Sequence, residues 1–366
     1  MLFRSPRETL ECLKAAGFFK ALGPRRFGGH EDDLESFFDA VIELAKACPS
    51  TAWVTSLFGI HTWMVGLFPE AAQTDVWPDA ESGDEVIIAS AIAPRGRATE
   101  VDGGYRLSGR WRCSSGCDDA GWTIMGAALD TGDGAPHRKL ELLVPAADYR
   151  IEDTWFVAGL RGTGSNDLVV DEAFVPAHRA LSLARLFAGS PQSQRVHDAP
   201  LFLLPWMPVF VFGLAAPAIG TALGALENYI EHVGTRRAAY TGALVAENAS
   251  SQVRVAEASS CIDAARLIMR RDLGEMRSYA ESGKRCPFAN AVRYRWDAPY
   301  VAKLCRQAVD MLFGAAGAAA LLNTSPLQRA FRDIHAMSAH AILNSDIAGQ
   351  IYGRELLGLR GDPSLF

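Results

Sequence analysis

The chain has 366 residues, of which 49% are hydrophobic and 21% are charged, with 33 Gly and 18 Pro. This composition is typical of a globular protein and excludes collagenous, low-complexity and intrinsically disordered classes. Lys and Arg total 36 against 42 Asp and Glu, so the net charge is −6. No basic run offers the electrostatic footprint expected of a nucleic-acid-binding protein.

The cysteines and the apolar stretches indicate where the protein acts. The seven cysteines are scattered along the chain, and an odd, dispersed set is typical of reduced thiols in a cytosolic protein. Cys113 and Cys117 lie four residues apart, but no second Cys/His pair stands at zinc spacing, so no metal site is expected. The longest apolar stretch, 201–224, is interrupted by prolines and indicates a buried core helix rather than a membrane span. We therefore expect a cytoplasmic protein without membrane contact.

The N-terminal part of the chain is predicted to be helical. Apolar residues recur at helical spacing over residues 10–22, the sequence PRRFGG (24–29) predicts a turn, and a second amphipathic helix is predicted at residues 33–47. The sequence Cys-Pro-Ser at 48–50 is expected to end it. Residues 51–68 are nearly all apolar, which predicts a buried helix, and His61 stands alone within it.

After Pro78 the pattern changes to short runs rich in Val, Ile, Tyr and Trp, bounded by Gly or Asp. Seven strands are predicted, at residues 86–90, 99–101, 105–111, 122–127, 139–145, 149–155 and 167–175. The Asp-Gly-Gly sequence at 102–104 predicts a hairpin turn between two of them. Seven short strands at this spacing favour a small barrel or sandwich.

From residue 200 the helical pattern returns. Four Ala-rich helices are predicted, at residues 214–235, 248–282, 297–313 and 330–357. Such helices suit a bundle in which the helices approach closely. The chain is thus predicted to be mainly α-helical with a central β-domain, divided into residues 1–83, 84–190 and 191–366.

This order of helices, β-domain and helical bundle resembles the acyl-CoA dehydrogenase superfamily. Four segments support the resemblance: GRWRCSSGCDDAGW (109–122), GLRGTGSNDLVVDEAFVPAHR (159–179), RRAAYTG (236–242) and FGAAGAAALLNTSPLQRAFRDIHA (313–336). The resemblance implies N-terminal helices, a small β-barrel or sandwich and a C-terminal four-helix bundle that together form one flavin site. It also implies a homotetramer. Most members carry a further helix before the equivalent of Leu10, so this chain begins late relative to the family.

One position separates a dehydrogenase from a monooxygenase within that superfamily. An acyl-CoA dehydrogenase needs a carboxylate base to remove a proton from its thioester substrate. In the commonest family arrangement this residue lies nine positions after the Arg of an Arg-Asp pair, which from Arg332 is Ala341. A methyl group cannot accept a proton. The chain offers His340 instead, and with His61 and the Ser-Ser-Gly-Cys-Asp run at 114–118 it is similar to the flavin-dependent, two-component monooxygenase branch.

The resemblance to that branch implies an activity. The chain would be the oxygenase component, using reduced flavin (FMNH₂ or FADH₂) and O₂, through a C4a-hydroperoxyflavin, to hydroxylate an aromatic or heteroaromatic small molecule. A separate NAD(P)H–flavin reductase is expected, because no nicotinamide-binding G-x-G-x-x-G follows a predicted strand. Two alternatives remain open: an acyl-CoA dehydrogenase with a relocated base, and a non-catalytic flavin-binding relative.

The resemblance also implies roles for individual residues. His340 and His61 are expected to hydrogen-bond the reacting oxygen atoms and to poise a substrate proton, since the pKa of histidine lies near neutrality. Ser114 is expected at flavin N5. The expected flavin-binding residues are Ser114, Ser115, Ser90, Arg237, Gly314 and Gly317, and the expected substrate-binding residues are Trp206, Phe212 and Asp118. Each also has a purely structural interpretation, as a core side chain, a turn cap, an exposed helix end or a packing glycine.

Overall fold

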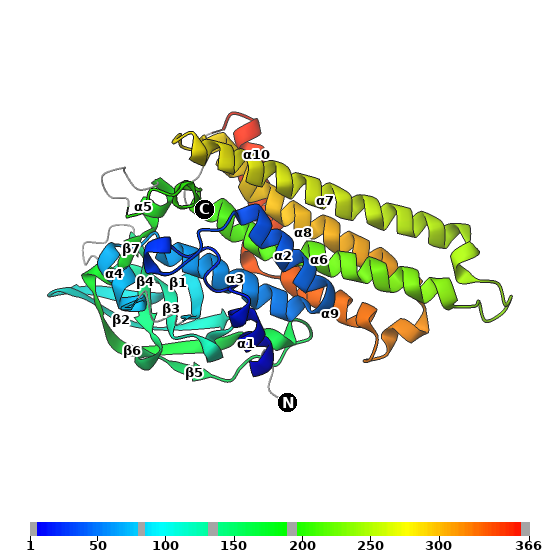
Figure 1. Cartoon of the computed structure of the whole chain (residues 1–366), viewed down its shortest axis with the longest axis horizontal. Helices are drawn as coiled ribbons and strands as arrows, with labels where there is room; N and C mark the ends of the chain where they lie inside the picture. The colour runs from blue at the N-terminus through cyan, green and yellow to red at the C-terminus, as the bar shows by residue number, and fades with distance from the viewer. Residues whose placement is uncertain (1–5, 80–84, 131–137, 189–195, 360–366) are drawn as a thin grey trace. The chain divides into compact units, whose positions relative to one another are not determined.

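The computed structural model describes residues 6–79, 85–130, 138–188 and 196–359 (Figure 1). The chain divides into two compact units. Unit 1 comprises Met1–Phe37, Leu57–Phe156 and Arg161–Trp206, and unit 2 comprises Phe38–Ser56, Val157–Leu160 and Met207–Phe366. The predicted boundaries at 83/84 and 190/191 lie outside the described residues. The three-part division therefore stays a prediction.

The N-terminal part is helical, as predicted. Its helices are α1 (Arg7–Ala15), α2 (Leu34–Ala47), α3 (Pro49–Val65) and α4 (Glu70–Val76). The predicted break occurs because proline has no N–H to donate but is well suited to the first position of a helix, so α2 ends and α3 begins with Pro49. Nearly every residue of α3 is buried, which explains why its apolar pattern runs all round the helix.

The strands of unit 1 form one mixed seven-stranded sheet. They are β1 (Ile88–Val101), β2 (Gly104–Ser114), β3 (Trp122–Asp130), β4 (Arg138–Pro145), β5 (Arg150–Glu152), β6 (Asn166–Pro176) and β7 (Ala180–Ser182). Their order in the sheet is β5-β6-β2-β1-β3-β4-β7. β1 pairs parallel with β3, and the other neighbouring strands pair antiparallel. The predicted hairpin joins β1 to β2, with Gly103 at φ 76° in its turn.

Two strand predictions need correction. The runs at 86–90 and 99–101 belong to the single strand β1, because a bulge between Ala91 and Gly96 takes up the irregular Ala-Pro-Arg-Gly stretch without ending the pairing. The three-residue β7 was not predicted, because so short a strand carries no readable alternation. Alternation along β1 places Ala89 in the core on one face of the sheet and Ser90 on the opposite face.

Unit 2 is built from long helices. They are α6 (Trp206–Thr235, whose first residue belongs to unit 1), α7 (Ala249–Glu281), α8 (Phe288–Ala315), α9 (Pro326–Ser338) and α10 (Ser345–Leu356), while the short α5 (Leu183–Ala188) lies in unit 1. α7 packs on α8, and α8 also packs on α9 and α10 (Figure 1). α8 begins at Phe288, well before the predicted residue 297, and it accommodates Pro299 in its interior.

α6 has the length and hydropathy of a membrane-spanning helix. Its most apolar window has a mean hydropathy of 2.0, yet 89% of that window is buried inside the fold. Glycines allow it to approach α2 closely, since a Cβ on Gly220 would lie 2.1 Å from the Ile42 carbonyl oxygen. This burial is typical of the core helix that the sequence predicted.

The predicted helix at 330–357 is in fact interrupted. α9 ends at Ser338, a short 3₁₀ turn (Ala341–Leu343) follows, and α10 begins at Ser345. Side chains cause the break: His340 Nδ1 accepts from the Ile342 N–H at 3.3 Å, and Asn344 Oδ1 accepts from the first N–H groups of α10. His340 therefore lies in a capping position between two helices rather than on a helix face.

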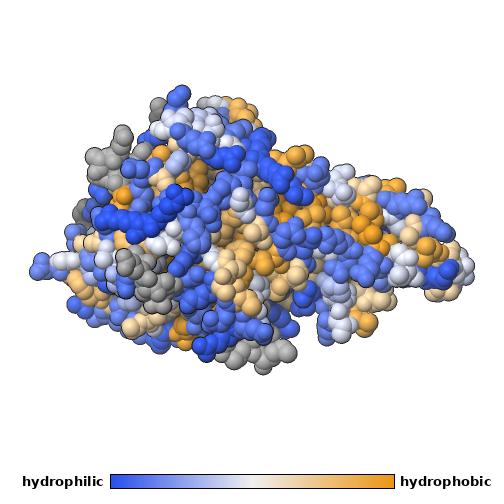
Figure 2. Space-filling model, in the orientation of Figure 1, coloured by the Kyte–Doolittle hydropathy of each residue, from blue (hydrophilic) through white to orange (hydrophobic). Residues whose placement is uncertain are grey.

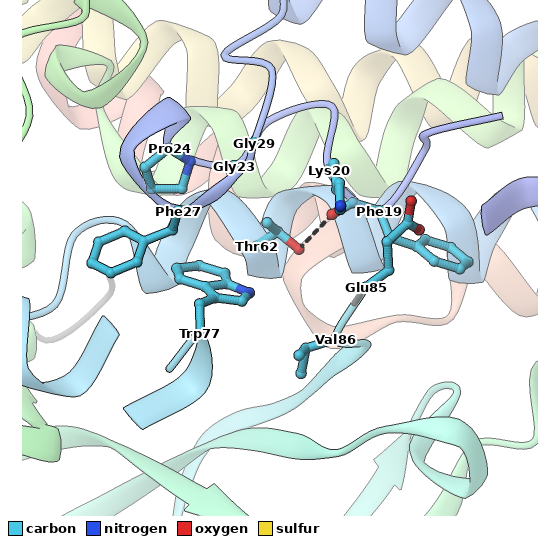
Figure 3. Close-up of a pocket in the computed structure, with 10 residues that line it drawn as sticks. All are labelled: Phe19, Lys20, Gly23, Pro24, Phe27, Gly29, Thr62, Trp77, Glu85 and Val86. Atoms are coloured by element: carbon cyan, nitrogen blue, oxygen red, sulfur yellow. Dashed lines mark hydrogen bonds between the residues drawn. The ribbon is translucent and has the colours of Figure 1, made fainter. Parts of the chain in front are cut away.

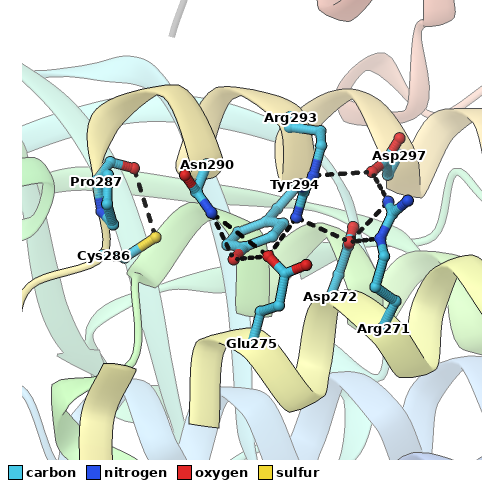
Figure 4. Close-up of polar contacts among 9 residues, drawn as sticks. All are labelled: Arg271, Asp272, Glu275, Cys286, Pro287, Asn290, Arg293, Tyr294 and Asp297. Carbon is cyan, nitrogen blue, oxygen red and sulfur yellow. Dashed lines mark hydrogen bonds and ion pairs between the residues drawn. The ribbon is translucent and has the colours of Figure 1, made fainter. Parts of the chain in front are cut away.

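A buried polar cluster joins α7 to α8 (Figure 4). Asp272 is fully buried, and its Oδ1 lies 2.9 Å from Arg271 and 3.5 Å from Arg293. Arg271 also contacts Asp297 at 2.5 Å. Burial, and after it the neighbouring Asp297, raises the pKa of Asp272. We infer that Asp272 keeps its proton at neutral pH, because burial and the neighbouring carboxylate of Asp297 both disfavour its ionised form.

Replacing Asp272 by asparagine is expected to flatten the pH dependence of stability above neutrality. A carboxyl whose folded pKa is raised contributes stability that is complete below its unfolded pKa of roughly 4 and is lost as the pH rises through the folded value. The thermal midpoint of the wild type should therefore fall by a few degrees between about pH 6 and about pH 9, and that of D272N should fall less.

Glu275 supplies the matched control. Burial works to raise the pKa of Glu275, but hydrogen bonds from Tyr294 and Arg293 outweigh it and lower the pKa. E275Q should accordingly lose stability at both pH values, because the ionised carboxylate is the form that these donors stabilise. The same pH dependence in D272N and the wild type would contradict the assignment of a proton to Asp272.

Candidate active site

In unit 1, His61 of α3 and Ser90 of β1 form a buried hydrogen-bonded pair. His61 is 1% exposed, with its Nδ1 2.8 Å from the Ile88 carbonyl oxygen and its Nε2 2.8 Å from Ser90 Oγ. A carbonyl oxygen only accepts, so Nδ1 carries the hydrogen of the neutral ring and Nε2 accepts from the Ser90 hydroxyl. Both residues were predicted from the sequence as site residues. The structure brings them together by a hydrogen bond between α3 and β1.

The pair is uncharged at neutral pH. Burial lowers the pKa of His61 to about 4, although the hydrogen bond to the Ile88 carbonyl works in the opposite direction. The imidazole is therefore a weak base that fixes the Ser90 hydroxyl. Because this hydroxyl donates to His61, the Ser90 oxygen keeps lone pairs that can accept a further hydrogen bond.

Ser114, at the end of β2, extends the network. Its Oγ donates to the Ser90 carbonyl oxygen at 3.1 Å, so its oxygen also retains acceptor capacity. The Ser114 side chain is fully buried, whereas Ser115 is half-buried. Of these two neighbours, Ser115 thus has the more accessible hydroxyl.

A strained turn positions the two serines. β2 ends in a register shift between Trp111 and Ser114, where Cys113 has φ 62°. Non-glycine residues with positive φ are costly and gather at functional sites. Gly116 follows with φ 71°, and a Cβ there would lie 2.3 Å from the Phe58 ring. Only glycine fits this close approach of the turn to α3.

Ser115 lies in a chain of hydroxyl groups. Its Oγ is 2.8 Å from Ser165 Oγ, which is 2.6 Å from Thr163 Oγ1, and the Gly116 N–H donates to the Thr163 carbonyl at 2.8 Å. Sequence analysis did not select Thr163 or Ser165. The signal that was available is the Thr-Gly-Ser triplet inside segment 159–179, where small hydroxyl residues flank a glycine.

Asp118 lies close to this turn but is already engaged. Its carboxylate oxygens lie 3.4 and 3.3 Å from the side-chain nitrogen of Asn166, at the start of β6. This contact ties the loop after β2 to β6. The role of Asp118 in substrate binding stays a prediction.

The donors and acceptors in unit 1 fit the ring of a reduced flavin. That ring presents N–H donors and carbonyl acceptors along one edge, and hydroxyl groups can serve both. Ser90, Ser114, Ser115 and the neutral His61 are all uncharged and held by defined hydrogen bonds. Across the described ranges, no group of three or more His, Cys, Asp or Glu side chains is placed to hold a metal ion.

A small pocket lies on another side of α3 (Figure 3). Thr62 lines it and donates to the Phe19 carbonyl oxygen at 3.2 Å, while the rings of Phe27 and Trp77 lie 5.6 Å apart at its wall. Its volume of about 10 Å³ accommodates roughly one water molecule. The pocket is therefore too small for a flavin or an aromatic substrate.

His340 belongs to unit 2, where its ring lies 5.7 Å from that of Trp53. Burial, followed by the positive charge of Arg295, lowers the pKa of His340 to about 4. Since Nδ1 accepts from the Ile342 N–H, the neutral ring carries its hydrogen on Nε2. The structure therefore presents His340 as a hydrogen-bond donor at Nε2.

The predicted phosphate contact, Arg237, is exposed and closes its own loop by donating to the Gly242 carbonyl at 3.0 Å. Its neighbour Arg236 lies over Gly317 instead, where a Cβ would be 2.5 Å from the guanidinium, and it donates to the Ala316 carbonyl. Sequence analysis did not select Arg236. The flavin-binding roles of Arg237 and Gly317 stay predictions.

The remaining predicted residues are placed as follows. Trp206 is 4% exposed at the start of α6, and Phe212 is fully buried within the same helix. A Cβ on Gly314 would meet no described atom within 4 Å. The burial of the two aromatic residues is compatible with a core role and with a pocket lining, and their substrate contact stays a prediction.

Comparison with known proteins identifies the family. Residues 212–345 match the family described as acyl-CoA dehydrogenase, C-terminal domain. The chain is 39% identical over 359 residues to the flavin-dependent monooxygenase oxygenase subunit HsaA of Rhodococcus jostii, covering 98% of this chain and 93% of that protein. It is 37% identical over 365 residues to the FADH₂-dependent resorcinol hydroxylase oxygenase component of a Rhizobium species, covering 97% of this chain and 88% of that protein.

A solved structure agrees with these relatives. The crystal structure of 3-HSA hydroxylase from Rhodococcus sp. RHA1 matches with a TM-score of 0.93 and 38% identity, covering 100% of this chain and 93% of that one. The resemblance and the fold class predicted from the sequence are thereby confirmed. The chain belongs to the flavin-dependent, two-component monooxygenase branch of the acyl-CoA dehydrogenase superfamily.

Proposed function

We propose that this oxygenase component hydroxylates a phenolic or other aromatic small molecule with O₂ and FADH₂, and that a separate NAD(P)H–flavin reductase supplies the FADH₂. The two relatives described above are named as oxygenase parts, and one is named as an FADH₂-dependent resorcinol hydroxylase. The observation that carries the proposal is the buried, neutral network of His61, Ser90 and Ser114. Bound reduced flavin supplies the electrons for O₂ activation.

The residues of the chain perform three tasks in this proposal. The Ser90 oxygen, fixed by His61, accepts a hydrogen bond from the substrate hydroxyl and orients the ring. Ser114 accepts from flavin N5–H, with Ser115 as the more accessible alternative. His340 donates from Nε2 to an oxygen that gains negative charge. The buried apolar residues of α3 exclude water from the reaction.

We also propose a cytoplasmic homotetramer. All seven cysteines are free thiols, which suits a reducing compartment. Val253 and Leu267 of α7 are 55% and 61% exposed, and Figure 2 shows hydrophobic surface among hydrophilic residues over the helical bundle. Such residues suit subunit contacts. A light-scattering mass equal to that of the monomer would contradict the tetramer.

Reconstitution with a separate flavin reductase tests the function. The chain, the reductase, NADH, catalytic FAD and a panel of phenols are combined under ¹⁸O₂, with catalase present to remove free H₂O₂. We expect one ¹⁸O atom in the hydroxylated product, detected by mass spectrometry, and no product when either protein is omitted. Absence of ¹⁸O from every product would refute the proposal.

An anaerobic titration separates the dehydrogenase alternative. If the chain were an acyl-CoA dehydrogenase, adding acyl-CoA thioesters to the FAD-loaded protein would bleach the flavin absorbance without O₂. We expect no bleaching, because Ala341 stands where the commonest family base would lie.

A further inference from the structure

Three hydroxyl groups of unit 1 form a chain, and the mechanism proposed above leaves the two inner ones without a role. Ser115 Oγ, in the turn after β2, lies 2.8 Å from Ser165 Oγ, which in turn lies 2.6 Å from Thr163 Oγ1. Ser165 and Thr163 are 3% and 1% exposed, whereas Ser115 is half-buried. The chain therefore begins at an accessible hydroxyl and continues into the interior.

Other bonds already hold the two segments of this chain together. The Gly116 N–H donates to the Thr163 carbonyl oxygen at 2.8 Å. The side-chain nitrogen of Asn166 lies 3.3 Å from a carboxylate oxygen of Asp118. These contacts tie the turn after β2 to the segment that leads into β6. What the hydroxyl chain adds is the direction in which each hydroxyl hydrogen points.

The number of hydrogens restricts that direction. A hydroxyl group donates one hydrogen bond and has two lone pairs with which to accept. Ser165 therefore cannot donate to both of its neighbours, and at least one of them donates to it. When Ser115 is the donor, its hydrogen points to Ser165, and the Ser115 oxygen offers only lone pairs to any other group. Ser165 can then pass its own hydrogen on to Thr163.

Reduced and oxidised flavin differ at the atom that such an oxygen would contact. Reduced flavin carries a hydrogen on N5 and donates from it, whereas N5 of oxidised flavin has no hydrogen and only accepts. A serine oxygen that offers only lone pairs matches reduced flavin and places two acceptors face to face when the flavin is oxidised. The burial of Ser165 and Thr163 strengthens this effect, because water does not replace their hydroxyl groups as partners.

We propose that Ser165, supported by Thr163, takes up the hydrogen of Ser115 and so makes the Ser115 oxygen an acceptor for flavin N5–H. Ser165 and Thr163 are thus positioning residues, through which the chain favours reduced over oxidised flavin. This inference rests on the proposed function, in which Ser115 is the more accessible serine for N5. An oxygenase component that receives reduced flavin from a separate reductase gains from this preference, because oxidised flavin is present in the same solution.

Anaerobic titration of the full-length chain with dithionite-reduced FAD and with oxidised FAD tests the preference. S165A should weaken the binding of reduced FAD roughly tenfold, as expected when a buried hydrogen-bond partner is lost. The affinity for oxidised FAD should change less than about twofold, because the Ser115 hydrogen is then able to turn toward N5. The midpoint potential of the bound flavin should fall by about 30 mV, which is the equivalent of a tenfold change for a two-electron couple.

Variants of Thr163 and Thr123 complete the set. T163V removes the inner end of the chain and should shift the affinity ratio in the same direction by a smaller factor, whereas T163S should keep the wild-type ratio. T123V is the matched control, because Thr123 is a fully buried hydroxyl that bonds the Tyr149 hydroxyl at 3.0 Å elsewhere in unit 1. It should bind both forms of FAD as the wild type does. If S165A does not fold, T163V and T163S still test the proposal.

A double-mutant cycle shows whether Ser165 acts through Ser115. Once Ser115 is alanine, the further change S165A should not weaken the binding of reduced FAD, because the hydroxyl that it positions is gone. A loss of affinity that persists in the S115A background would overturn the proposal. Equal weakening of both forms of FAD in S165A, or a wild-type affinity ratio in both S165A and T163V, would also overturn it.

These measurements need no O₂, NADH or aromatic substrate. A chain that prefers reduced FAD through Ser165 but hydroxylates no phenol would refute the proposed function alone. A hydroxylating chain whose S165A and T163V variants keep the wild-type affinity ratio would refute this inference alone.

Discussion

Replacing His340 by alanine is expected to lower the rate of substrate hydroxylation by about 10²–10³-fold, the usual effect of removing one preorganised donor from an oxygen that gains charge. The backbone N–H of Ile342 holds Nδ1 as an acceptor, so Nε2–H is the donor that the neutral ring offers. The measurement is the single-turnover rate of product formation with chemically reduced FAD, which removes the reductase from the kinetics.

Two further substitutions separate the two roles of His340, which caps the Ile342 N–H through Nδ1 and offers a hydrogen-bond donor at Nε2. H340N keeps an acceptor that can cap the Ile342 N–H but loses the donor at the Nε2 position, so it should be as stable as the wild type and nearly as slow as H340A. H340Q extends an amide donor toward the Nε2 position and should recover part of the rate. A histidine on α9 supplies the control: His335 is bound to Asp310 at 2.8 Å, and H335A should react at the wild-type rate. A fast H340N would show that only the cap matters.

The second large effect concerns acid stability and comes from His61. Its pKa is about 4 in the folded protein and 6.5 in its ordinary state. The unfolded chain therefore binds a proton more readily, so stability is complete above about pH 6.5 and is lost as the pH falls toward 4. For a residue that is 1% exposed, this difference corresponds to about 3 kcal/mol of unfolding free energy.

Denaturant unfolding at about pH 7 and about pH 4.5 measures this effect. H61N should be less stable than the wild type at neutral pH, because it leaves the Ser90 hydroxyl without its acceptor, but it should lose less stability on acidification. S90A is the control: it removes the partner and leaves His61 buried, so it should keep the wild-type acid sensitivity. Equal acid sensitivity of H61N and the wild type would show that His61 is not the responsible group.

The sequence alone determined the kind of protein. Local patterns suffice for α3, whose apolar run cannot be an exposed helix, and for the Asp-Gly-Gly hairpin between β1 and β2. The four motif segments, in their order along the chain, indicated the family that the comparisons confirm. His61 and Ser114 were selected from the resemblance to the monooxygenase branch, and Ser90 was selected from its place on the predicted strand before residues 93–94.

Tertiary structure decided what these residues do. Ser90 lies 29 positions from His61 and 24 from Ser114, so their hydrogen bonds depend on how α3, β1 and β2 pack, which no local pattern encodes. The break between α9 and α10 likewise depends on a turn in which the His340 and Asn344 side chains accept hydrogen bonds from nearby backbone N–H groups. That turn sets the tautomer of His340 and hence makes it a donor.

The burial of Arg295 shows the same limit most clearly. In the sequence it is one arginine of a charged segment, and only the packing of α8 against its neighbouring helices shows that the guanidinium is 6% exposed and unpaired at Nη1 among the described residues. Helical spacing places residues on a stripe, but the elements that cover that stripe are distant in the chain. The sequence thus determined the family, the fold and most of the proposed site residues. Tertiary contacts decided the burial of His61 and Arg295 and the tautomer of His340. They did so because distant parts of the chain exclude water from these side chains and supply their hydrogen-bond partners.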